Sequence, residues 1–534
     1  MTFATARTVA LNGALGHLID VQVDVSAGQA GVTMVGRGDA ALREGQERLR
    51  MAVVNSGLYW PSSKRTTILL SPADLPKAGT HFDLAIGIGL LAAIEAVGEA
   101  DIRHDAFIGE LTLAGGLRPA VGVLPMVLAA AERGIRRVFV PEPQVREAEM
   151  VPDVEVYGVR SLGQVVAILN GEEPPESSPV VAASGTPLLT WRGEERLEEV
   201  DLADLDGLAD VKYAVEVAAA GGHPIFLTGP KGAGKTSIAE RIPTIMPDLT
   251  PAESLELTAI HSLAGVLDPG SGMVRRPPYS APHHDASKAS IVGGGQGRVS
   301  PGEISRAHCG VLFLDEFPLF RRDVIEALRQ PLESGDITVA RQEESVTLPA
   351  RCLLVLAANP CPCGNWAANV GDDRCRCLTP VRRAYQQRIS GPITDRIDIT
   401  RRVVAAGRAQ RDPFGTETSA EVQTRVAAAR RRQAERYAGR SWRLNAQLPG
   451  ARLKDTWPIA VEGQQAIERQ CLSGRLSARG AVRVARLAWT VADLAAVRSG
   501  RDVQPGGAEV EVALRLRSSA PLDLAAARGQ ERAG

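Results

Sequence analysis

The sequence contains the stretch Phe226-Leu-Thr-Gly-Pro-Lys-Gly-Ala-Gly-Lys-Thr-Ser237, with an apolar run (Pro224–Leu227) at its start and a helix-forming run (Ile238–Ile242) after it. This order predicts a strand, a glycine-rich loop and a helix. Glycines let a backbone wrap around phosphate oxygens, and the first turn of a helix presents N–H groups without helical partners. The stretch therefore predicts a phosphate-binding loop (P-loop) rather than a glycine-rich turn without function.

Each position of the P-loop has an expected role in binding ATP and Mg²⁺. Lys235 adds positive charge beside the phosphates, and the hydroxyl of Thr236 is expected to hold Mg²⁺. The other predicted nucleotide-binding residues are Gly229, Pro230, Lys231, Gly232, Ala233, Gly234 and Ser237.

Two later apolar runs end in polar residues that fit the same site. Val311-Leu-Phe-Leu-Asp-Glu316 ends in two acids, of which Asp315 is expected to hold Mg²⁺ through water and Glu316 to polarise the attacking water. Leu353-Leu-Val-Leu-Ala-Ala-Asn359 is a second such strand, and Asn359 is expected to orient that water. Together with the P-loop, these strands predict an α/β fold with an AAA+ core built on a parallel sheet.

Two arginines are candidates for completing the site. In ring ATPases an arginine at the end of the core stabilises the γ-phosphate of the neighbouring subunit. Arg396, in Asp395-Arg-Ile-Asp398, is the predicted arginine finger, and Arg388 is the alternative. Arg479, at the start of a predicted helix, matches the second sensor position, whose arginine touches phosphate and couples hydrolysis to lid movement.

Four of the seven cysteines form two Cys-x-Cys pairs separated by eleven residues: Cys361, Cys363, Cys375 and Cys377. Four thiolates on one loop suit tetrahedral zinc, so a structural zinc site is favoured over reduced thiols, and no catalytic zinc is expected. His283 and His284 lack a third ligand at suitable spacing. We expect them to cap a turn or line a subunit boundary.

Composition and charge describe a soluble protein with one unusual segment. The chain is 44% hydrophobic and 23% charged, with a net charge of −1. The apolar run Leu84–Ile94 is too short to span a membrane and predicts a buried helix. No signal peptide is recognisable, so a cytoplasmic location without a membrane partner is expected. The segment Arg374–Arg443 carries 17 Arg, no Lys and 6 acidic residues, which fits either a salt-bridged helical face or a polyanion-binding surface.

A length of 534 residues predicts several domains. Residues 1–170 alternate short strands and helices, and Pro76–Ala85 and Phe107–Gly122 resemble the proteolytic domain of Lon-type proteases. Lys77 and Pro125 stand where that family has its nucleophilic Ser and catalytic Lys, so a Lon-like (S5-type) fold without peptidase chemistry is expected. The remaining expected units are a linker at 171–199, the AAA+ core at 200–404 with a Cys-rich loop at 361–377, a helical lid at 405–500 and a poorly ordered tail at 501–534.

The order of these motifs, together with Pro301-Gly-Glu-Ile-Ser305, Asn359-Pro-Cys-Pro-Cys363 and Ser477-Ala-Arg479, resembles the YifB/ComM group of magnesium-chelatase-like AAA+ ATPases. The resemblance runs from about residue 3 to 497. The resemblance implies a homohexameric, DNA-stimulated ATPase. The activity it implies is that of a helicase that moves DNA branches during recombination. Lys231 and Ala233 depart from the usual Pro and Ser of the family, and Gly207-Leu208 replaces its Gly-Gln, but no phosphate ligand is lost.

The candidates for contact with DNA phosphates are a predicted glycine-rich insertion, with Lys288 and Arg298, and a predicted hairpin at 337–348. Two other classes of function are weighed against the DNA motor. A chelatase-like ATPase that remodels a protein partner is the alternative, although the motor subunit of magnesium chelatase lacks the Lon-like domain and the Cys-x-Cys pairs. A nucleotide-gated scaffold with little turnover is disfavoured because Glu316, Asn359 and Arg396 are intact.

Overall fold

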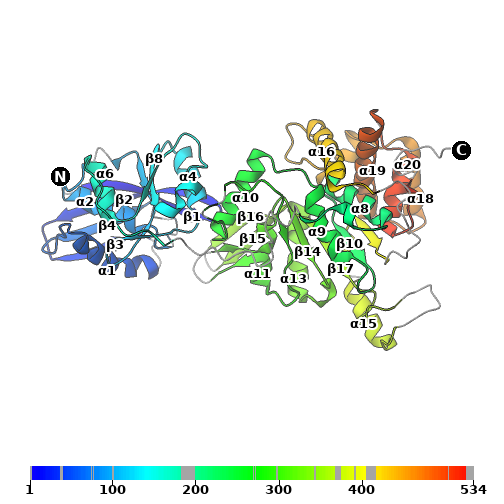
Figure 1. Cartoon of the computed structure of the whole chain (residues 1–534), viewed down its shortest axis with the longest axis horizontal. Helices are drawn as coiled ribbons and strands as arrows, with labels where there is room; N and C mark the ends of the chain where they lie inside the picture. Colours follow the sequence, from blue (N-terminus) through cyan, green and yellow to red (C-terminus); the bar gives the residue numbers. More distant parts are fainter. Residues whose placement is uncertain are drawn as a thin grey trace.

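The computed structural model describes residues 3–36, 40–73, 75, 77, 79–98, 102–181, 199–268, 270, 272–295, 299–341, 344–366, 375–389, 393–404, 416–502 and 504–524. The molecule is elongated, with an N-terminal domain at one end, a central core and a helical lid at the other end (Figure 1). Among the described residues, no helix is long and apolar enough to cross a membrane.

The N-terminal domain packs helices against a four-stranded sheet of order β1-β2-β4-β3 and a three-stranded parallel sheet of order β5-β8-β9. Alternate residues of β2 are buried, as its period-2 pattern predicts, and α2 is buried along its whole length. The elements of this domain are β1 (Phe3–Asn12), β2 (Leu15–Ser26), β3 (Gly31–Val35), α1 (Ala40–Asn55), β4 (Arg65–Ser71), α2 (Asp83–Ala93), β5 (Asp105–Phe107), β6 (Glu110–Leu111), β7 (Leu117–Arg118), α4 (Val123–Glu132), β8 (Arg137–Pro141), η1 (Glu142–Gln144), α5 (Val145–Ala148), β9 (Glu155–Val159) and α6 (Leu162–Asn170).

The two positions that match the Lon catalytic pair, Lys77 and Pro125, are both buried in the N-terminal domain. Lys77 is 1% exposed and donates a hydrogen bond to the carbonyl of Pro72. Pro125 is buried in the first turn of α4, where its missing N–H costs no helical hydrogen bond. A proline at this place offers no group that accepts a proton.

The central core is a five-stranded sheet of order β11-β14-β17-β10-β18, and each paired strand in it runs parallel to its neighbour. The apolar runs of β10, β14 and β17 are buried, as expected for strands covered on both faces. The predicted α/β fold with a parallel sheet is therefore confirmed. The elements are η2 (Leu202–Asp204), α8 (Ala209–Gly221), β10 (Ile225–Thr228), α9 (Lys235–Ile245), α10 (Pro251–Leu263), β11 (Tyr279–Ser280), α11 (Lys288–Val292), β12 (Gly293–Gly294), β13 (Ser300–Pro301), α12 (Glu303–Arg306), β14 (Val311–Leu314), η3 (Phe317–Leu319), α13 (Arg322–Ala327), α14 (Arg329–Ser334), β15 (Asp336–Arg341), β16 (Glu344–Pro349), β17 (Leu353–Ala358), α15 (Thr379–Ile389), η4 (Thr394–Arg396) and β18 (Ile399–Arg402).

Strands β15 and β16 pair antiparallel, which confirms the predicted hairpin. The run Arg322–Gly335 has the sequence pattern of a single helix, but in the structure it forms two helices, α13 and α14. Pro331 has no N–H to donate to the carbonyl of Ala327, the last residue of α13, so the helix breaks there.

Among the described residues, the N-terminal domain contacts the core through α4 and through the β1–β2 turn. Helix α4 packs against α10, and the buried carboxylate of Glu147 accepts hydrogen bonds from the Ser262 hydroxyl and from the Leu124 N–H at 2.9 Å. The β1–β2 turn lies against the β15–β16 hairpin, where a Cβ on Gly13 would meet Cγ1 of Val346 at 2.3 Å. Gly13 also has φ +62, so this turn needs glycine for both reasons.

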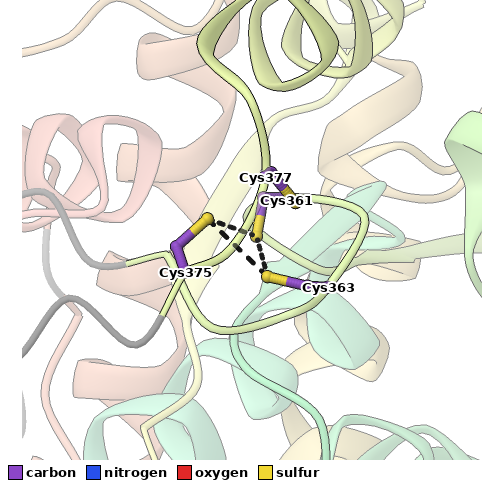
Figure 2. Close-up of side chains that lie close together, drawn as sticks. All are labelled: Cys361, Cys363, Cys375 and Cys377. Carbon is purple, nitrogen blue, oxygen red and sulfur yellow. Dashed lines mark hydrogen bonds between the residues drawn. The ribbon is translucent and has the colours of Figure 1, made fainter.

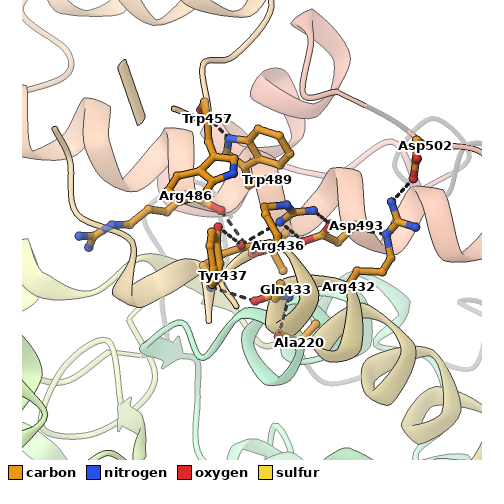
Figure 3. A network of polar contacts seen from close by, with 12 residues as sticks. Ala220, Arg432, Gln433, Arg436, Tyr437, Trp457, Arg486, Trp489, Asp493 and Asp502 are labelled. Atoms are coloured by element: carbon orange, nitrogen blue, oxygen red, sulfur yellow. Dashed lines mark hydrogen bonds and ion pairs between the residues drawn. The ribbon is translucent and has the colours of Figure 1, made fainter. Parts of the chain in front are cut away.

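Polar contacts of α16 hold the lid helices together and join the lid to the core (Figure 3). Arg436 pairs with Asp493 and stacks over Trp489 at 4.5 Å, while Gln433 donates to the carbonyl of Ala220 at 3.1 Å. Nearer the N-terminus of the same helix, Arg425 forms an ion pair with Glu216 of α8 at 2.8 Å. The salt-bridged interpretation therefore holds for this part of the arginine-rich segment. The lid elements are α16 (Ser419–Arg436), η5 (Asn445–Gln447), α17 (Arg452–Asp455), α18 (Val461–Leu472), α19 (Ala478–Ser499) and α20 (Gly507–Ser518).

The expectation of a poorly ordered tail from residue 501 is wrong for the described part of that segment. Residues Gly507–Ser518 form α20, which packs against α18, α19 and β18. Val510, Ala513 and Leu516 are each 0% exposed. These apolar residues recur every third position between charged ones, a helical pattern that the charges obscured. Residues 525–534 lie outside the described ranges.

We expect Leu516→Ala to destabilise the lid by about 2–5 kcal/mol, because it leaves a cavity under α20. Leu472→Ala is the matched control, since Leu472 is 89% exposed and its loss is expected to cost no more than about 0.5 kcal/mol. Thermal unfolding followed by circular dichroism measures the difference. Equal unfolding midpoints for the two variants would mean that α20 is not part of the folded lid.

Candidate functional site

The glycines of the P-loop are required by local geometry. Gly232 and Gly234 have φ +73 and +92, in the left-handed region that favours glycine. A Cβ on Gly229 would lie 2.2 Å from the carbonyl oxygen of Val403, at the end of the adjacent strand β18. The P-loop thus begins in close contact with the end of β18 and leads directly into α9.

Lys235 connects the P-loop to the end of β17. Its side chain is 8% exposed, and the ammonium donates to the carbonyls of Gly229 at 2.8 Å and Pro230 at 2.9 Å and to Oδ1 of Asn359 at 3.0 Å. Burial lowers the pKa of Lys235, and the carboxylates of Asp315 and Glu316 act in the opposite direction. The predicted pair Lys235 and Asn359 therefore meets at one point.

The two predicted magnesium ligands lie together. The hydroxyl of Thr236 donates to Oδ2 of Asp315 at 2.9 Å, and both residues are partly open to solvent. Oxygen donors of this kind fit Mg²⁺, which keeps several water ligands. Glu316 follows with φ +48, an uncommon conformation for a residue other than glycine and one that occurs at active sites.

Arg396 lies at the opposite edge of the sheet from the P-loop. Strand β18 runs parallel to β10, with Ile399 opposite Ile225 and Arg402 opposite Thr228. The P-loop follows Thr228, whereas Arg396 precedes Ile399, so the length of the strands, about 10 Å, and the flanking residues separate them. Arg396 forms an ion pair with Glu333 at 2.6 Å and lines a cavity of about 500 Å³ together with Lys288 and Thr338.

The lid reaches this same edge through α19. Arg483 donates to the backbone carbonyl of Arg396 at 2.7 Å and to Asp398 at 2.6 Å. Asp398 also contacts His223 at 2.8 Å in the buried interior. Arg479 is exposed and lies one helical turn before Arg483, so it shares the side of the molecule that carries Arg396.

Three of the cysteines in the Cys-rich loop form a compact triangle, and the fourth lies beside them (Figure 2). The sulfur of Cys361 is 3.3 Å from that of Cys363 and 3.6 Å from that of Cys375, and the Cys363–Cys375 separation is 3.6 Å. All four sulfurs, including that of Cys377, lie within 4.8 Å of one another. Tetrahedral zinc with Zn–S bonds of about 2.3 Å requires S···S separations of about 3.8 Å, so this cluster fits.

The histidine pair remains close to the surface. His283 and His284 stack at 4.1 Å, and each contacts Asp285, at 3.3 and 3.6 Å. The backbone of Asp285 donates to Nδ1 of His283 at 3.4 Å, which agrees with the expected turn. Lys288 begins α11, whereas Arg298 lies outside the described residues.

The sequence assigned no role to four residues near the site: Glu333, Tyr385, Asp398 and Arg483. Tyr385 is 8% exposed and faces the backbone of Asn359 and the carboxylate of Glu316. Burial and then the charge of Glu316 raise its pKa to about 12. Each of these contacts joins segments far apart in the chain, so no local spacing predicts it.

Three family matches cover most of the chain. Residues 21–144 match the subunit ChlI of Mg-chelatase, residues 201–411 match magnesium chelatase, subunit ChlI, and residues 416–517 match the C-terminal part of that subunit.

Similar proteins extend over nearly the full length. An uncharacterised protein of Mycobacterium tuberculosis is 41% identical over 97% of this chain and 99% of its own length. Competence protein ComM of Haemophilus influenzae is 36% identical, and the uncharacterised protein YifB of Escherichia coli is 37% identical, each over 92% of this chain and 94% of its own length. In addition, Lon protease 4 of Sorangium cellulosum is 34% identical over 120 residues, 21% of this chain.

Proposed function

The chain belongs to the YifB/ComM family of magnesium-chelatase-like AAA+ proteins, and we propose that it is a magnesium-dependent ATPase that acts as a hexameric motor on DNA. The observation that carries the ATPase proposal is the grouping of Lys235, Thr236, Asp315 and Asn359, whose side chains touch at one edge of the sheet. Glu316 stands beside them as the candidate base. Bound Mg²⁺ would neutralise charge on the phosphates.

The chain's own residues divide the work of hydrolysis. Backbone N–H groups of the P-loop and Lys235 bind the phosphates, Thr236 and Asp315 hold the magnesium, and Asn359 orients the water that Glu316 polarises. Arg396 is too far from its own P-loop to take part there. Arg396, and with it Arg479, is therefore assigned to the nucleotide of a neighbouring subunit, as in a closed ring.

The DNA part of the proposal is supported by the family and by the positions of basic residues. One relative is named a competence protein. Lys288 and the root of the β15–β16 hairpin line the same cavity as Arg396, so the candidate contacts with DNA adjoin the arginine finger. A movement of the hairpin would thus change the surroundings of Arg396 at the proposed site between subunits.

We also assign zinc to the cluster of Cys361, Cys363, Cys375 and Cys377. Four sulfurs at 3.3–3.6 Å or within 4.8 Å of one another match the donor number and spacing that close a structural zinc site. Since all four positions of a tetrahedral ion would be filled by protein, the metal would hold the loop and would not bind substrate.

We expect Glu316→Gln to lower ATP turnover about 100-fold or more while ATP binding is retained, because the base is lost and the phosphate ligands stay. Glu462→Gln, at an exposed position of α18, is the control. Turnover is measured with and without single-stranded DNA, and nucleotide binding with a fluorescent ATP analogue.

The outcomes separate the parts of the proposal. Wild-type turnover should rise with DNA, and binding of DNA should weaken with salt. An ATPase that neither binds DNA nor responds to it would contradict the DNA motor and favour the chelatase-like alternative, an ATPase acting on a protein partner. Full turnover in Glu316→Gln would remove the assigned base.

Purified protein is expected to contain about one zinc ion per chain, because four thiolates close a tetrahedral site. Cys363→Ser/Cys375→Ser should lose the metal, whereas Cys471→Ser, outside the loop, should keep it. Elemental analysis by mass spectrometry gives the content. Freshly reduced wild-type protein without zinc would contradict the assignment.

A further inference from the structure

Helix α15 is a basic arm on the surface of the core. It projects beyond the edge of the core, away from the lid helices α16 and α19 (Figure 1). From Arg374 to Ile389 the sequence carries five Arg and no Asp or Glu. Within the described residues, Arg382, Arg383 and Arg388 form no ion pair with a carboxylate, in contrast to Arg425 and Arg436 of α16.

The base of the arm is fixed at the nucleotide site by two contacts. Tyr385 is the buried residue of α15, which packs against η3, the turn that directly follows Glu316. Its phenol faces the backbone of Asn359, and the carboxylate of Glu316 lies close enough to raise the pKa of the phenol. One side of α15 therefore packs against the turn after Glu316, while Arg383, two positions before Tyr385, is exposed.

The second contact comes from the Cys-rich loop, which leads into α15. Gly364, with φ +81, presses on the P-loop so closely that a Cβ there would lie 2.9 Å from Cγ of Lys231. Cys361 and Cys363, just before Gly364, lie beside Cys375 and Cys377, just before α15, so the cysteine cluster brings the two ends of this loop together. The arm is thus attached to both the P-loop and the turn after Glu316.

We propose that α15 binds the phosphate backbone of nucleic acid and reports its occupancy to the ATP site through Tyr385. This inference rests on the proposed function, because it names where DNA would be sensed by the ATPase. Arginines without carboxylate partners match a chain of phosphates, and a small displacement of α15 would move Tyr385 against Glu316 and Asn359. In this role Tyr385 is a positioning residue.

The arm offers more than charge to a nucleic acid. Arg382 stacks over the ring of Trp366 at 5.2 Å, at the junction of the Cys-rich loop and the helix. Leu378 and Val381 are 74% and 50% exposed on the same segment. Phosphates would meet the guanidinium groups beside these exposed apolar side chains, and contacts to the phosphate backbone do not depend on base sequence.

The test measures single-stranded DNA binding by fluorescence anisotropy over a salt series, and ATP turnover with and without DNA, on the full chain. Arg382→Ala/Arg383→Ala should weaken DNA binding about tenfold or more and reduce the slope of log K against log salt by about 1.4, two contacts' worth for a single strand. Its ratio of stimulated to unstimulated turnover should fall. Arg440→Ala/Arg443→Ala, at exposed positions of the lid, is the matched control and should bind like the wild type.

Two further variants keep the result interpretable. Arg382→Lys/Arg383→Lys retains the positive charge and should keep most of the DNA binding. Retained binding in this variant would show that the alanine variant loses binding because it loses charge. Tyr385→Phe should bind DNA as the wild type does but show at least threefold less stimulation of turnover by DNA.

Wild-type binding and stimulation that persist in Arg382→Ala/Arg383→Ala would overturn the inference and leave the proposed function standing. A wild-type protein that binds no DNA would instead overturn the proposed function, and the inference with it. If Arg382→Ala/Arg383→Ala binds DNA as the wild type does and loses only binding to an acidic peptide, the partner of α15 is a protein and the nucleic-acid assignment is wrong. Normal stimulation in Tyr385→Phe would remove the relay.

Discussion

The parallel pairing of β10 with β17 on one side and β18 on the other constrains the rest of the molecule. The carboxyl ends of parallel strands lie at the same edge of a sheet. The P-loop, Asp315 and Asn359 follow those ends, so they lie together at that edge. The same pairing places Arg396, which precedes β18, at the opposite edge. A chain built this way has the candidate phosphate ligands and the candidate finger on opposite sides, and in the proposed ring the two kinds of group would meet between neighbouring copies.

Ion pairs with buried carboxylates hold the lid helices to one another and to helix α8 of the core. Glu216 of α8 is 2% exposed and pairs with Arg425 and Arg498, while Asp493 pairs with Arg436 under the ring of Trp489. Removing one partner of such a pair leaves an unpaired buried charge, which is costly. Arg483 extends this network to the backbone of Arg396. The lid therefore helps to position Arg396, and in the proposed ring a movement of the lid would change the position of the candidate finger.

The sequence predicted the parts of the site that depend on short motifs. Thr236, Asp315 and Asn359 each follow a recognisable strand, and their roles depend on chemistry that few residue types supply. Tyr385 and Glu333 were not predicted, because their contacts join distant segments. The break at Pro331 was missed although a proline marked it, and α20 was missed because charges separate its apolar residues. Among the described arginines of 374–443, ion pairs with buried carboxylates distinguish Arg425 and Arg436 of α16 from the exposed Arg383 and Arg388 of α15.

The most direct test of the central claim, a nucleotide site shared between subunits, is a mixing experiment. Lys235→Ala cannot hold the phosphates but keeps Arg396, and Arg396→Ala keeps the P-loop but lacks the finger. Each variant alone should hydrolyse little ATP, whereas an equal mixture should recover up to about a quarter of wild-type turnover, the share of interfaces that pair an intact P-loop with an intact finger. A mixture no more active than the two variants measured separately, or full turnover by Arg396→Ala alone, would contradict a shared site.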